Sequence, residues 1–182
     1  SLTGRSDLRA TDNGVGRYVN NKTILVTGGA GSIGSDLVRQ VLNYDPTKVI
    51  VLDASEENIY NLQEELGHAN PKILFLLGNV LEDNLVTSIF KSGVDLVFHA
   101  AAYKHVNVVE ANVLSAIKTN FEGTEKIISA CINFRVESFL LVSTDKAVRP
   151  TNIMGASKRL AELATIQANK NFGGVCKFSM VR

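Results

Sequence analysis

The sequence has 182 residues, of which 45% are hydrophobic and 20% charged, and this composition is typical of a globular domain with one core. A formal net charge of +1 and scattered basic residues argue against nucleic-acid binding. Apolar runs stay well below the ~20 residues of a membrane span, so we expect no membrane contact for this chain. Cys131 and Cys176 lack metal-ligand spacing, which predicts no metal site and reduced core thiols in a cytoplasmic protein.

Two regions of the chain differ in pattern. Residues 1–21 are polar without sustained periodicity and are predicted to form an arm or linker. Residues 22–182 alternate between short apolar runs and helical periodicity, which predicts one domain. Strands are predicted at residues 22–27, 48–53, 72–77, 95–99, 137–143 and 175–181. Helices are predicted at residues 32–42, 55–67, 81–92, 111–134 and 155–171, with a kink near Gly123.

The predicted strands are continuous hydrophobic runs, which is the pattern of parallel strands covered on both faces. Strands that alternate with helices form right-handed βαβ units. The sequence therefore predicts an α/β protein of the Rossmann type. Its doubly wound parallel sheet would have the strand order 3-2-1-4-5-6 and helices on both faces.

A glycine-rich loop lies between the first predicted strand and its helix. Gly28, Gly31 and Gly34 are each three residues apart. The first allows a tight turn, the second lets a pyrophosphate approach the backbone, and the third lets the helix pack closely. Ser32 and Ile33 open the helix, whose free N–H groups and positive dipole end attract an anion. This pattern predicts a dinucleotide-binding loop.

An acidic residue ends the second predicted strand. Asp53 follows Gly34 by 19 residues, the spacing at which a carboxylate accepts both ribose hydroxyls of the adenosine half of the cofactor. The same carboxylate would repel a 2′-phosphate, and the neighbouring Ala54 offers no positive charge to hold one. We therefore expect NAD as the cofactor in preference to NADP.

Small and polar residues follow the third and fourth predicted strands. Asn79 and Val80 would meet the adenine through a side-chain amide and a backbone N–H. Ala100, Ala101 and Ala102 would leave room for the cofactor. Because carboxyl ends of parallel strands share one edge of the sheet, we expect all of these residues at one crevice.

Five motifs together carry a family resemblance: TGGAGSIG, HAAAYKHV, TNFEGT, VSTDKAVRPTN and MGASKRLAE. The chain resembles the extended short-chain dehydrogenase/reductase superfamily from about residue 22 to residue 182. More narrowly, it resembles the CapD-like nucleoside-diphosphate-sugar 4,6-dehydratases of bacterial polysaccharide biosynthesis. This resemblance implies conversion of UDP-GlcNAc, or a related UDP-N-acetylhexosamine, to a UDP-4-keto-6-deoxy sugar.

The resemblance also assigns roles to residues near the fifth strand. It implies Lys146 as the base that removes the C5 proton, Asp145 as the acid for the departing C6 hydroxyl, and Thr144 as a partner of the sugar O4. Lys158 would hold the nicotinamide ribose. Met154 stands four residues earlier, where most of the superfamily has an acid/base tyrosine, and a thioether carries no proton.

Asn120 matches a superfamily position whose asparagine lies near the nicotinamide or orders the helix. Two other functions remain open: a nucleotide-sugar C4 epimerase or reductase, which Met154 disfavours, and a non-catalytic NAD-binding scaffold, which retention of Asp145, Lys146 and Lys158 disfavours.

Extended enzymes of this superfamily usually continue into a C-terminal substrate lobe, so we expect this chain to be part of a longer protein and to have little or no turnover alone. The resemblance implies a homo-oligomeric parent that is anchored at the inner face of the bacterial membrane.

Overall fold

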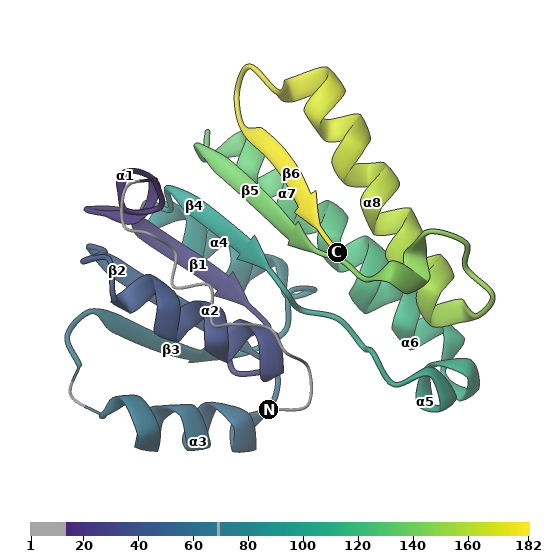
Figure 1. Ribbon diagram of the computed structural model, residues 1–182, viewed down its shortest axis with the longest axis horizontal. Helices are drawn as coiled ribbons and strands as arrows, with labels where there is room; N and C mark the ends of the chain where they lie inside the picture. The colour runs from purple at the N-terminus through teal and green to yellow at the C-terminus, as the bar shows by residue number, and fades with distance from the viewer. Residues whose placement is uncertain (1–13, 69) are drawn as a thin grey trace.

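The computed structural model describes residues 14–68 and 70–182. In this part of the chain, six strands form one parallel sheet in the order β3-β2-β1-β4-β5-β6 (Figure 1). The predicted Rossmann topology is confirmed, and the order reverses between β1 and β4. The strands are β1 (Thr23–Thr27), β2 (Lys48–Asp53), β3 (Ile73–Leu77), β4 (Leu96–His99), β5 (Ser138–Val142) and β6 (Lys177–Val181).

The main helices cover both faces of the sheet. Those on one face are α2 (Ser32–Leu42) and α3 (Glu56–Leu66), whose Val38 and Leu62 pack with strand residues in one core cluster. Those on the other face are α4 (Asp83–Lys91), α7 (Gly123–Asn133) and α8 (Ile153–Phe172), which enclose the second cluster. Every helix within residues 14–68 and 70–182 is too short or too polar to cross a lipid bilayer.

The two cysteines lie in the second core cluster. Cys131 and Cys176 are buried and form no disulfide, as predicted for core thiols. Burial of the Cys131 thiol raises its pKa well above the ordinary value, which keeps it in the neutral form.

Part of the predicted arm is folded into the domain. Helix α1 (Gly16–Val19) precedes β1, and the side chain of Val19 is buried in the first core cluster. The backbone N–H of Asn21 donates to the carbonyl oxygen of Asp45. This part of the predicted arm or linker is therefore packed against the domain through Val19. Residues 1–13 of the predicted arm lie outside the described residues.

Strand β3 is less covered than its apolar sequence predicts. It lies at the edge of the sheet, where Leu74 and Leu77 are exposed to 38% and 58%. The expectation that each apolar strand is buried on both faces is wrong here, because an edge strand has a neighbour on one side only. The inner strands fit the expectation, and β2 buries four consecutive residues.

The predicted helix 111–134 is divided into several pieces. Helices α5 (Val106–Ala111) and α6 (Val113–Ile117) are separated by Asn112, whose ψ of 50° interrupts the helix. A π-helical turn, Lys118–Glu122, then joins α6 to α7. The predicted kink near Gly123 lies at this turn. A Cβ on Gly123 would come within 2.7 Å of the Val80 side chain, so the glycine lets α7 lie close to the segment after β3.

Candidate cofactor cleft and catalytic turn

A cleft of about 620 Å³ opens at the carboxyl ends of β1, β2, β3 and β4. It lies where the strand order reverses, which is where doubly wound sheets bind their ligands. The structure brings together here the predicted cofactor-binding residues from the first four strand ends. They are Gly28, Gly31, Ser32, Ile33, Gly34, Asp53, Ala54, Asn79, Val80, Ala100, Ala101 and Ala102.

A different neighbour would meet a Cβ at each of the three spaced glycines, so each position requires glycine to a different degree. Gly28 has φ of +63°, and a Cβ there would lie 2.7 Å from the Ala101 backbone of the neighbouring strand end. A Cβ on Gly34 would lie 2.0 Å from the carbonyl oxygen of Gly28, so helix α2 can pack on the loop only without a side chain. A Cβ on Gly31 would meet just that carbonyl, at 3.3 Å, and otherwise open space. The packing therefore explains Gly28 and Gly34, whereas Gly31 leaves a surface free for a ligand.

The amino end of α2 forms the floor of the cleft. Ser32 and Ile33 are its first two residues and are exposed, so their backbone N–H groups lie where a helix has no internal acceptors for them. Lys104, in the segment that follows β4, donates from its ammonium group to the Ser32 hydroxyl at 3.0 Å. Both features make this end of the cleft suitable for an anion.

Asp53 joins the second strand to the glycine-rich loop. One carboxylate oxygen accepts from the Ala30 backbone N–H at 3.0 Å, and the other accepts from the Ser55 N–H at 3.0 Å. Ser55 in turn caps α3 by accepting from the N–H of Asn58. Each carboxylate oxygen has a further lone pair, so Asp53 can accept additional hydrogen bonds from a ligand.

A buried histidine, His99, directly precedes Ala100, which lines the cleft. His99 ends β4 and is completely buried between the hydroxyls of Thr27 and Thr124, at 2.6 and 3.0 Å from its ring nitrogens. Burial lowers the pKa of His99 to about 3, and the nearby charge of Lys158 acts in the same direction. His99 is therefore a neutral part of the core at physiological pH.

Asn120 orders the segment that follows β4. It is 1% exposed; its amide oxygen accepts from the Tyr103 N–H at 2.7 Å, and its amide nitrogen donates to the Tyr103 carbonyl and to Ser157 Oγ, each at 3.0 Å. These contacts hold the Tyr103 backbone after β4 and leave both expected roles, the nicotinamide contact and the ordering of the helix, as predictions. Because Ser157 precedes Lys158, Asn120 also links the cleft wall to α8.

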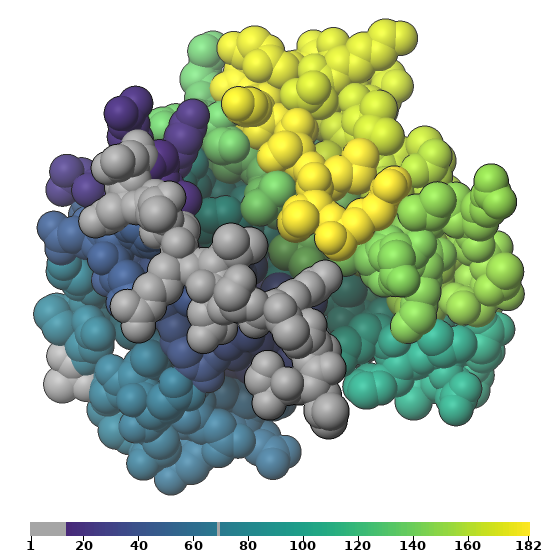
Figure 2. Space-filling view, in the orientation of Figure 1, coloured from purple at the N-terminus to yellow at the C-terminus, as the bar shows by residue number. Residues whose placement is uncertain are grey.

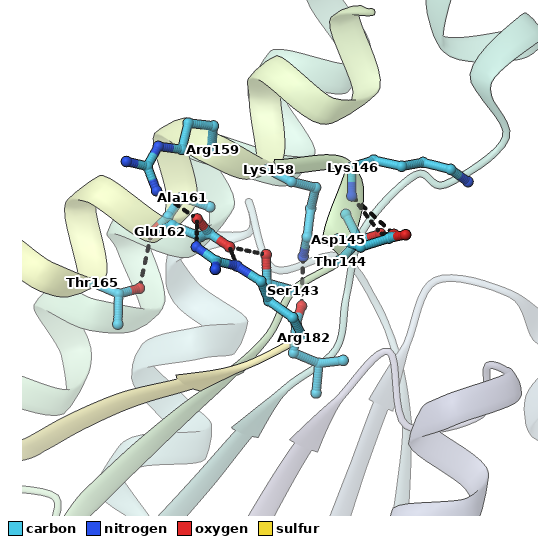
Figure 3. A network of polar contacts seen from close by, with 11 residues as sticks. Ser143, Thr144, Asp145, Lys146, Lys158, Arg159, Ala161, Glu162, Thr165 and Arg182 are labelled. Atoms are coloured by element: carbon cyan, nitrogen blue, oxygen red, sulfur yellow. Dashed lines mark hydrogen bonds and ion pairs between the residues drawn. The ribbon is translucent and has the colours of Figure 1, made fainter. Parts of the chain in front are cut away.

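A second group of predicted residues lies at the carboxyl end of β5. Thr144 leads into a short 3₁₀ turn, Asp145–Ala147, and donates its hydroxyl to the Asp145 carboxylate at 2.9 Å. The same carboxylate accepts from the Lys146 backbone N–H at 2.9 Å. Asp145 and Lys146 are exposed, and the Lys146 side chain extends away from its neighbours (Figure 3). The turn thus presents an acid and an amine to solvent.

The amino end of α8 packs directly on this turn. Asn152 caps the helix by accepting from the Gly155 N–H at 2.8 Å. A Cβ on Gly155 would lie 2.5 Å from the Lys146 carbonyl oxygen, so close packing requires glycine here.

Lys158 and Met154 lie one helical turn apart on the buried side of α8. Lys158 is 6% exposed, and its ammonium group donates to the Val142 carbonyl oxygen at 2.7 Å. Burial lowers the pKa of Lys158 to about 8, against the opposing charge of Glu162. Met154 is 3% exposed and packs with Val109 and Ala116. Met154 is therefore a packing residue in this structure, whereas burial makes Lys158 easier to deprotonate than an exposed lysine.

A buried carboxylate that the sequence analysis did not single out lies beside this group. Glu162 is completely buried and receives hydrogen bonds from Ser143, Arg159 and Arg182 (Figure 3). The signal in the sequence was its position four residues after Lys158, which places both on one face of α8. In the space-filling view, the end of the chain lies against the green segment that follows β5 (Figure 2).

The fold and the glycine-rich cleft define a doubly wound protein of the short-chain dehydrogenase/reductase type. Residues 24–182 match the family model described as polysaccharide biosynthesis protein, and the chain belongs to this family.

Its relatives include an uncharacterized membrane protein of Methanocaldococcus jannaschii, 43% identical over 92% of this chain and 50% of the relative. A Campylobacter jejuni UDP-N-acetylglucosamine 4,6-dehydratase (inverting) is 35% identical over 85% of this chain and 46% of its own length. A Rickettsia akari UDP-glucose 4-epimerase is 39% identical over 80% of this chain and 43% of its own length. The chain thus spans half or less of the length of these relatives.

Two solved structures show the same fold. The Pen protein of Bacillus thuringiensis is 36% identical, with a TM-score of 0.86 over 91% of this chain and 51% of its own. The dTDP-glucose 4,6-dehydratase DesIV of Streptomyces venezuelae, solved with NAD and DAU bound, is 28% identical. Its TM-score is 0.73 over 82% of this chain and 52% of its own.

Proposed function

We propose that this chain is the NAD-binding part of a nucleotide-sugar 4,6-dehydratase that acts on UDP-GlcNAc or a related UDP-N-acetylhexosamine. The observation that carries the proposal is the placement of two groups at one edge of the sheet. The glycine-rich cleft lies at the ends of β1 to β4, and the Thr144–Lys146 turn lies at the end of β5 beside Lys158. Relatives named as 4,6-dehydratases and the NAD-bound DesIV structure support it.

The cleft fits a dinucleotide. The diphosphate would lie on the backbone N–H groups of Ser32 and Ile33, where the absence of a Cβ on Gly31 leaves room. The lone pairs of Asp53 that the loop does not use would accept the ribose hydroxyls, and its negative charge favours NAD over NADP. Lys158 would donate to the hydroxyls of the nicotinamide ribose.

The exposed turn fits the elimination of water. The chemistry that NAD⁺ would supply, when bound in the cleft, is the removal of a hydride from C4 of the sugar and its later return to C6. Once C4 is a ketone, the C5 proton is acidic and would pass to the amine of Lys146, which would return it to C5 when the hydride reaches C6. The O4 proton would pass through the Thr144 hydroxyl to the Asp145 carboxylate, to which Thr144 donates at 2.9 Å. Asp145 would then give this proton to the C6 hydroxyl, which leaves as water. Thr144 would hold the sugar O4 by a hydrogen bond.

The epimerase function is the second candidate, because a relative named as UDP-glucose 4-epimerase is 39% identical. Met154 weighs against it. A C4 epimerase of the usual superfamily kind needs an acid/base group at this position, and Met154 offers a buried thioether. The two functions give different products, because dehydration removes the C6 oxygen and epimerisation keeps it.

The proposal concerns the protein that contains this chain together with the further length of its relatives. We infer that this longer protein supplies the nucleotide-sugar pocket, forms a homo-oligomer and is membrane-anchored, and that the 182 residues alone bind NAD(H) with little or no turnover.

Product analysis of the longer protein with UDP-GlcNAc tests the proposal. We expect a UDP-4-keto-6-deoxy sugar from the wild type and at least a hundredfold loss of rate in Lys146→Ala, since a positioned base contributes roughly 10²–10⁴-fold. Lys91→Ala, a lysine at the end of α4, serves as the matched control and should keep full activity. Retained dehydration in Lys146→Ala would remove the proposed base, and a product that keeps its C6 oxygen would favour the epimerase.

A further inference from the structure

A charged side chain with no exposed surface lies next to the candidate catalytic turn. The Glu162 side chain is 0% exposed, yet it carries a negative charge that four hydrogen bonds stabilise. Its pKa is lowered to about 2, chiefly by the guanidinium of Arg182 and with help from Ser143 and Arg159. Burying a charge costs desolvation free energy unless hydrogen bonds and opposite charges compensate it. We therefore ask what this fully paired carboxylate does for the site.

The partners of Glu162 come from three different elements. Arg182 follows β6 and binds both carboxylate oxygens, Nε to Oε1 at 2.8 Å and Nη2 to Oε2 at 2.9 Å. Ser143 follows β5 and donates its hydroxyl to Oε1 at 2.7 Å. Arg159 lies on α8 and donates to Oε2 at 2.9 Å. One carboxylate therefore fastens the carboxyl ends of two strands to the helix that crosses them.

This joint lies within one residue of the groups proposed for catalysis. Ser143, which Glu162 holds, directly precedes Thr144, where the exposed turn begins. Val142, one residue earlier, receives the hydrogen bond from Lys158. The turn itself has few other constraints on its outer side, because Asp145 and Lys146 are exposed.

We propose that Glu162 is a positioning residue of the candidate catalytic centre. Its carboxylate fixes the end of β5 against α8, and this sets the place of the Thr144–Lys146 turn relative to Lys158. The inference rests on the proposed function in one respect, namely that the Thr144–Lys146 turn and Lys158 are catalytic. The positioning itself is a property of the 182-residue chain and can be measured without substrate.

A bidentate ion pair elsewhere in the chain provides the matched control. Arg39 binds Glu65 with Nε at 2.6 Å and Nη2 at 2.7 Å, the same two-pronged geometry, but Glu65 is half-exposed and joins α2 to α3 away from the turn. Glu162→Gln and Glu65→Gln therefore remove the same charge from the same kind of pair. Glu162→Asp keeps the charge at a shorter reach, and Ser143→Ala removes one donor and leaves both arginine contacts.

The readouts are amide hydrogen exchange at Ala147 and Val148, whose N–H groups close the turn, and the NMR signal of the Lys158 ammonium group. The titratable groups that interact with Lys158 are Glu162 on α8 and His99 on β4, and Arg182 after β6 is the ion-pair partner of Glu162. In Glu162→Gln we expect about tenfold faster exchange in the turn and a changed Lys158 titration, with partial recovery in Glu162→Asp. In Glu65→Gln both readouts should match the wild type.

The design separates positioning from stability. If Glu162→Gln melts at lower temperature but keeps wild-type exchange in the turn and wild-type Lys158 titration while folded, Glu162 only stabilises the fold and the proposal is wrong. If Glu162→Gln does not fold, Ser143→Ala decides: faster exchange in the turn with a nearly unchanged melting temperature supports the proposal, and unchanged exchange overturns it.

In the longer enzyme, we expect Glu162→Gln to lower kcat more than it changes KM, and Glu65→Gln to change neither. Equal losses in the two variants would contradict a positioning role. An inactive wild type would instead count against the proposed function and would leave the exchange result intact, so the two failures are distinguishable.

Discussion

The carboxylate of Asp53 accepts a hydrogen bond from the backbone N–H of Ala30 at 3.0 Å, across the gap between the end of β2 and the glycine-rich loop. Its second oxygen accepts from Ser55, the cap of α3. The residue proposed to select the cofactor therefore also shapes the loop that would hold the diphosphate.

Replacement of Asp53 tests this double role. Asp53→Ala should weaken NAD⁺ binding by roughly 10- to 100-fold, because hydrogen bonds to a charged group contribute about 1.5–3 kcal/mol. Asp53→Asn should narrow the preference for NAD⁺ over NADP⁺, since the repulsion of a 2′-phosphate is gone. Isothermal titration calorimetry measures both. Asp45→Asn, an exposed carboxylate paired with Lys72, is the control. Wild-type affinity in Asp53→Ala would show that Asp53 does not contact the cofactor.

Two glycines of the loop should respond in opposite ways to alanine. Gly31→Ala should fold with a loss of stability within about 1 kcal/mol, because its φ of −72° suits alanine and the new Cβ meets one oxygen at 3.3 Å. It should nevertheless lose NAD⁺ binding by about tenfold or more. Gly34→Ala should lose several kcal/mol of stability, because its Cβ would be 2.0 Å from the Gly28 carbonyl oxygen. Thermal unfolding and calorimetry separate the two, and full NAD⁺ affinity in Gly31→Ala would contradict the placement of the diphosphate.

His99 should make the domain sensitive to acid. Thr124 donates its hydroxyl to the Asn120 carbonyl, so His99 must donate to Thr124 through Nε2 and accept from Thr27 through Nδ1. A second proton on Nδ1 would require the Thr27 hydroxyl to turn from donor to acceptor. This arrangement agrees with the lowering of the His99 pKa to about 3.

The unfolded chain takes up a proton on His99 below pH 6.5, whereas the folded chain does so only near pH 3. The free energy of unfolding should therefore fall as the pH drops from 6.5 towards 3, by a total on the order of 5 kcal/mol. Below pH 4.5, protonation of Glu162 adds to the loss. Urea unfolding of the wild type and His99→Asn at pH 7, 6 and 5 measures the slope. An equal slope in both proteins would mean that His99 is not the group responsible.

Met154 should be replaceable by another apolar side chain of similar volume. Met154→Leu should change stability by less than about 1.5 kcal/mol, and Met154→Ala should cost roughly 2–5 kcal/mol, because it leaves a cavity beside Val109 and Ala116. In the longer enzyme, Met154→Leu should keep activity, since the thioether transfers no proton. A folded but inactive Met154→Leu would give the sulfur a chemical role.

The sheet order and the position of the cleft could be predicted from sequence because they depend on local patterns. Apolar runs that alternate with helical periodicity allow few topologies, and the turns after β1, β2, β3 and β4 must share one edge. Asp53 and Gly31 were found in this way. The order of elements alone was enough to place them in one cleft.

Other features depend on contacts between segments that no local pattern encodes. Among the apolar residues near α1, Val15 and Tyr18 are exposed and Val19 is buried, and only the packing of Val19 in the first core cluster makes α1 part of the domain. The exposure of Leu77 follows from its place at the sheet edge. In the sequence, Glu162 resembles any charged residue of a helix. Its special position follows from its contacts with Ser143 and Arg182, which come from two strand ends in the folded chain.

Titration of the 182-residue chain with NAD⁺ by calorimetry tests the central claim most directly. We expect saturable one-to-one binding that Gly31→Ala weakens and that NADP⁺ reproduces only at higher concentration. If the folded chain shows no binding of NAD⁺ or NADH even at millimolar concentration, the cleft at the ends of β1 to β4 is not a dinucleotide site and the account is wrong.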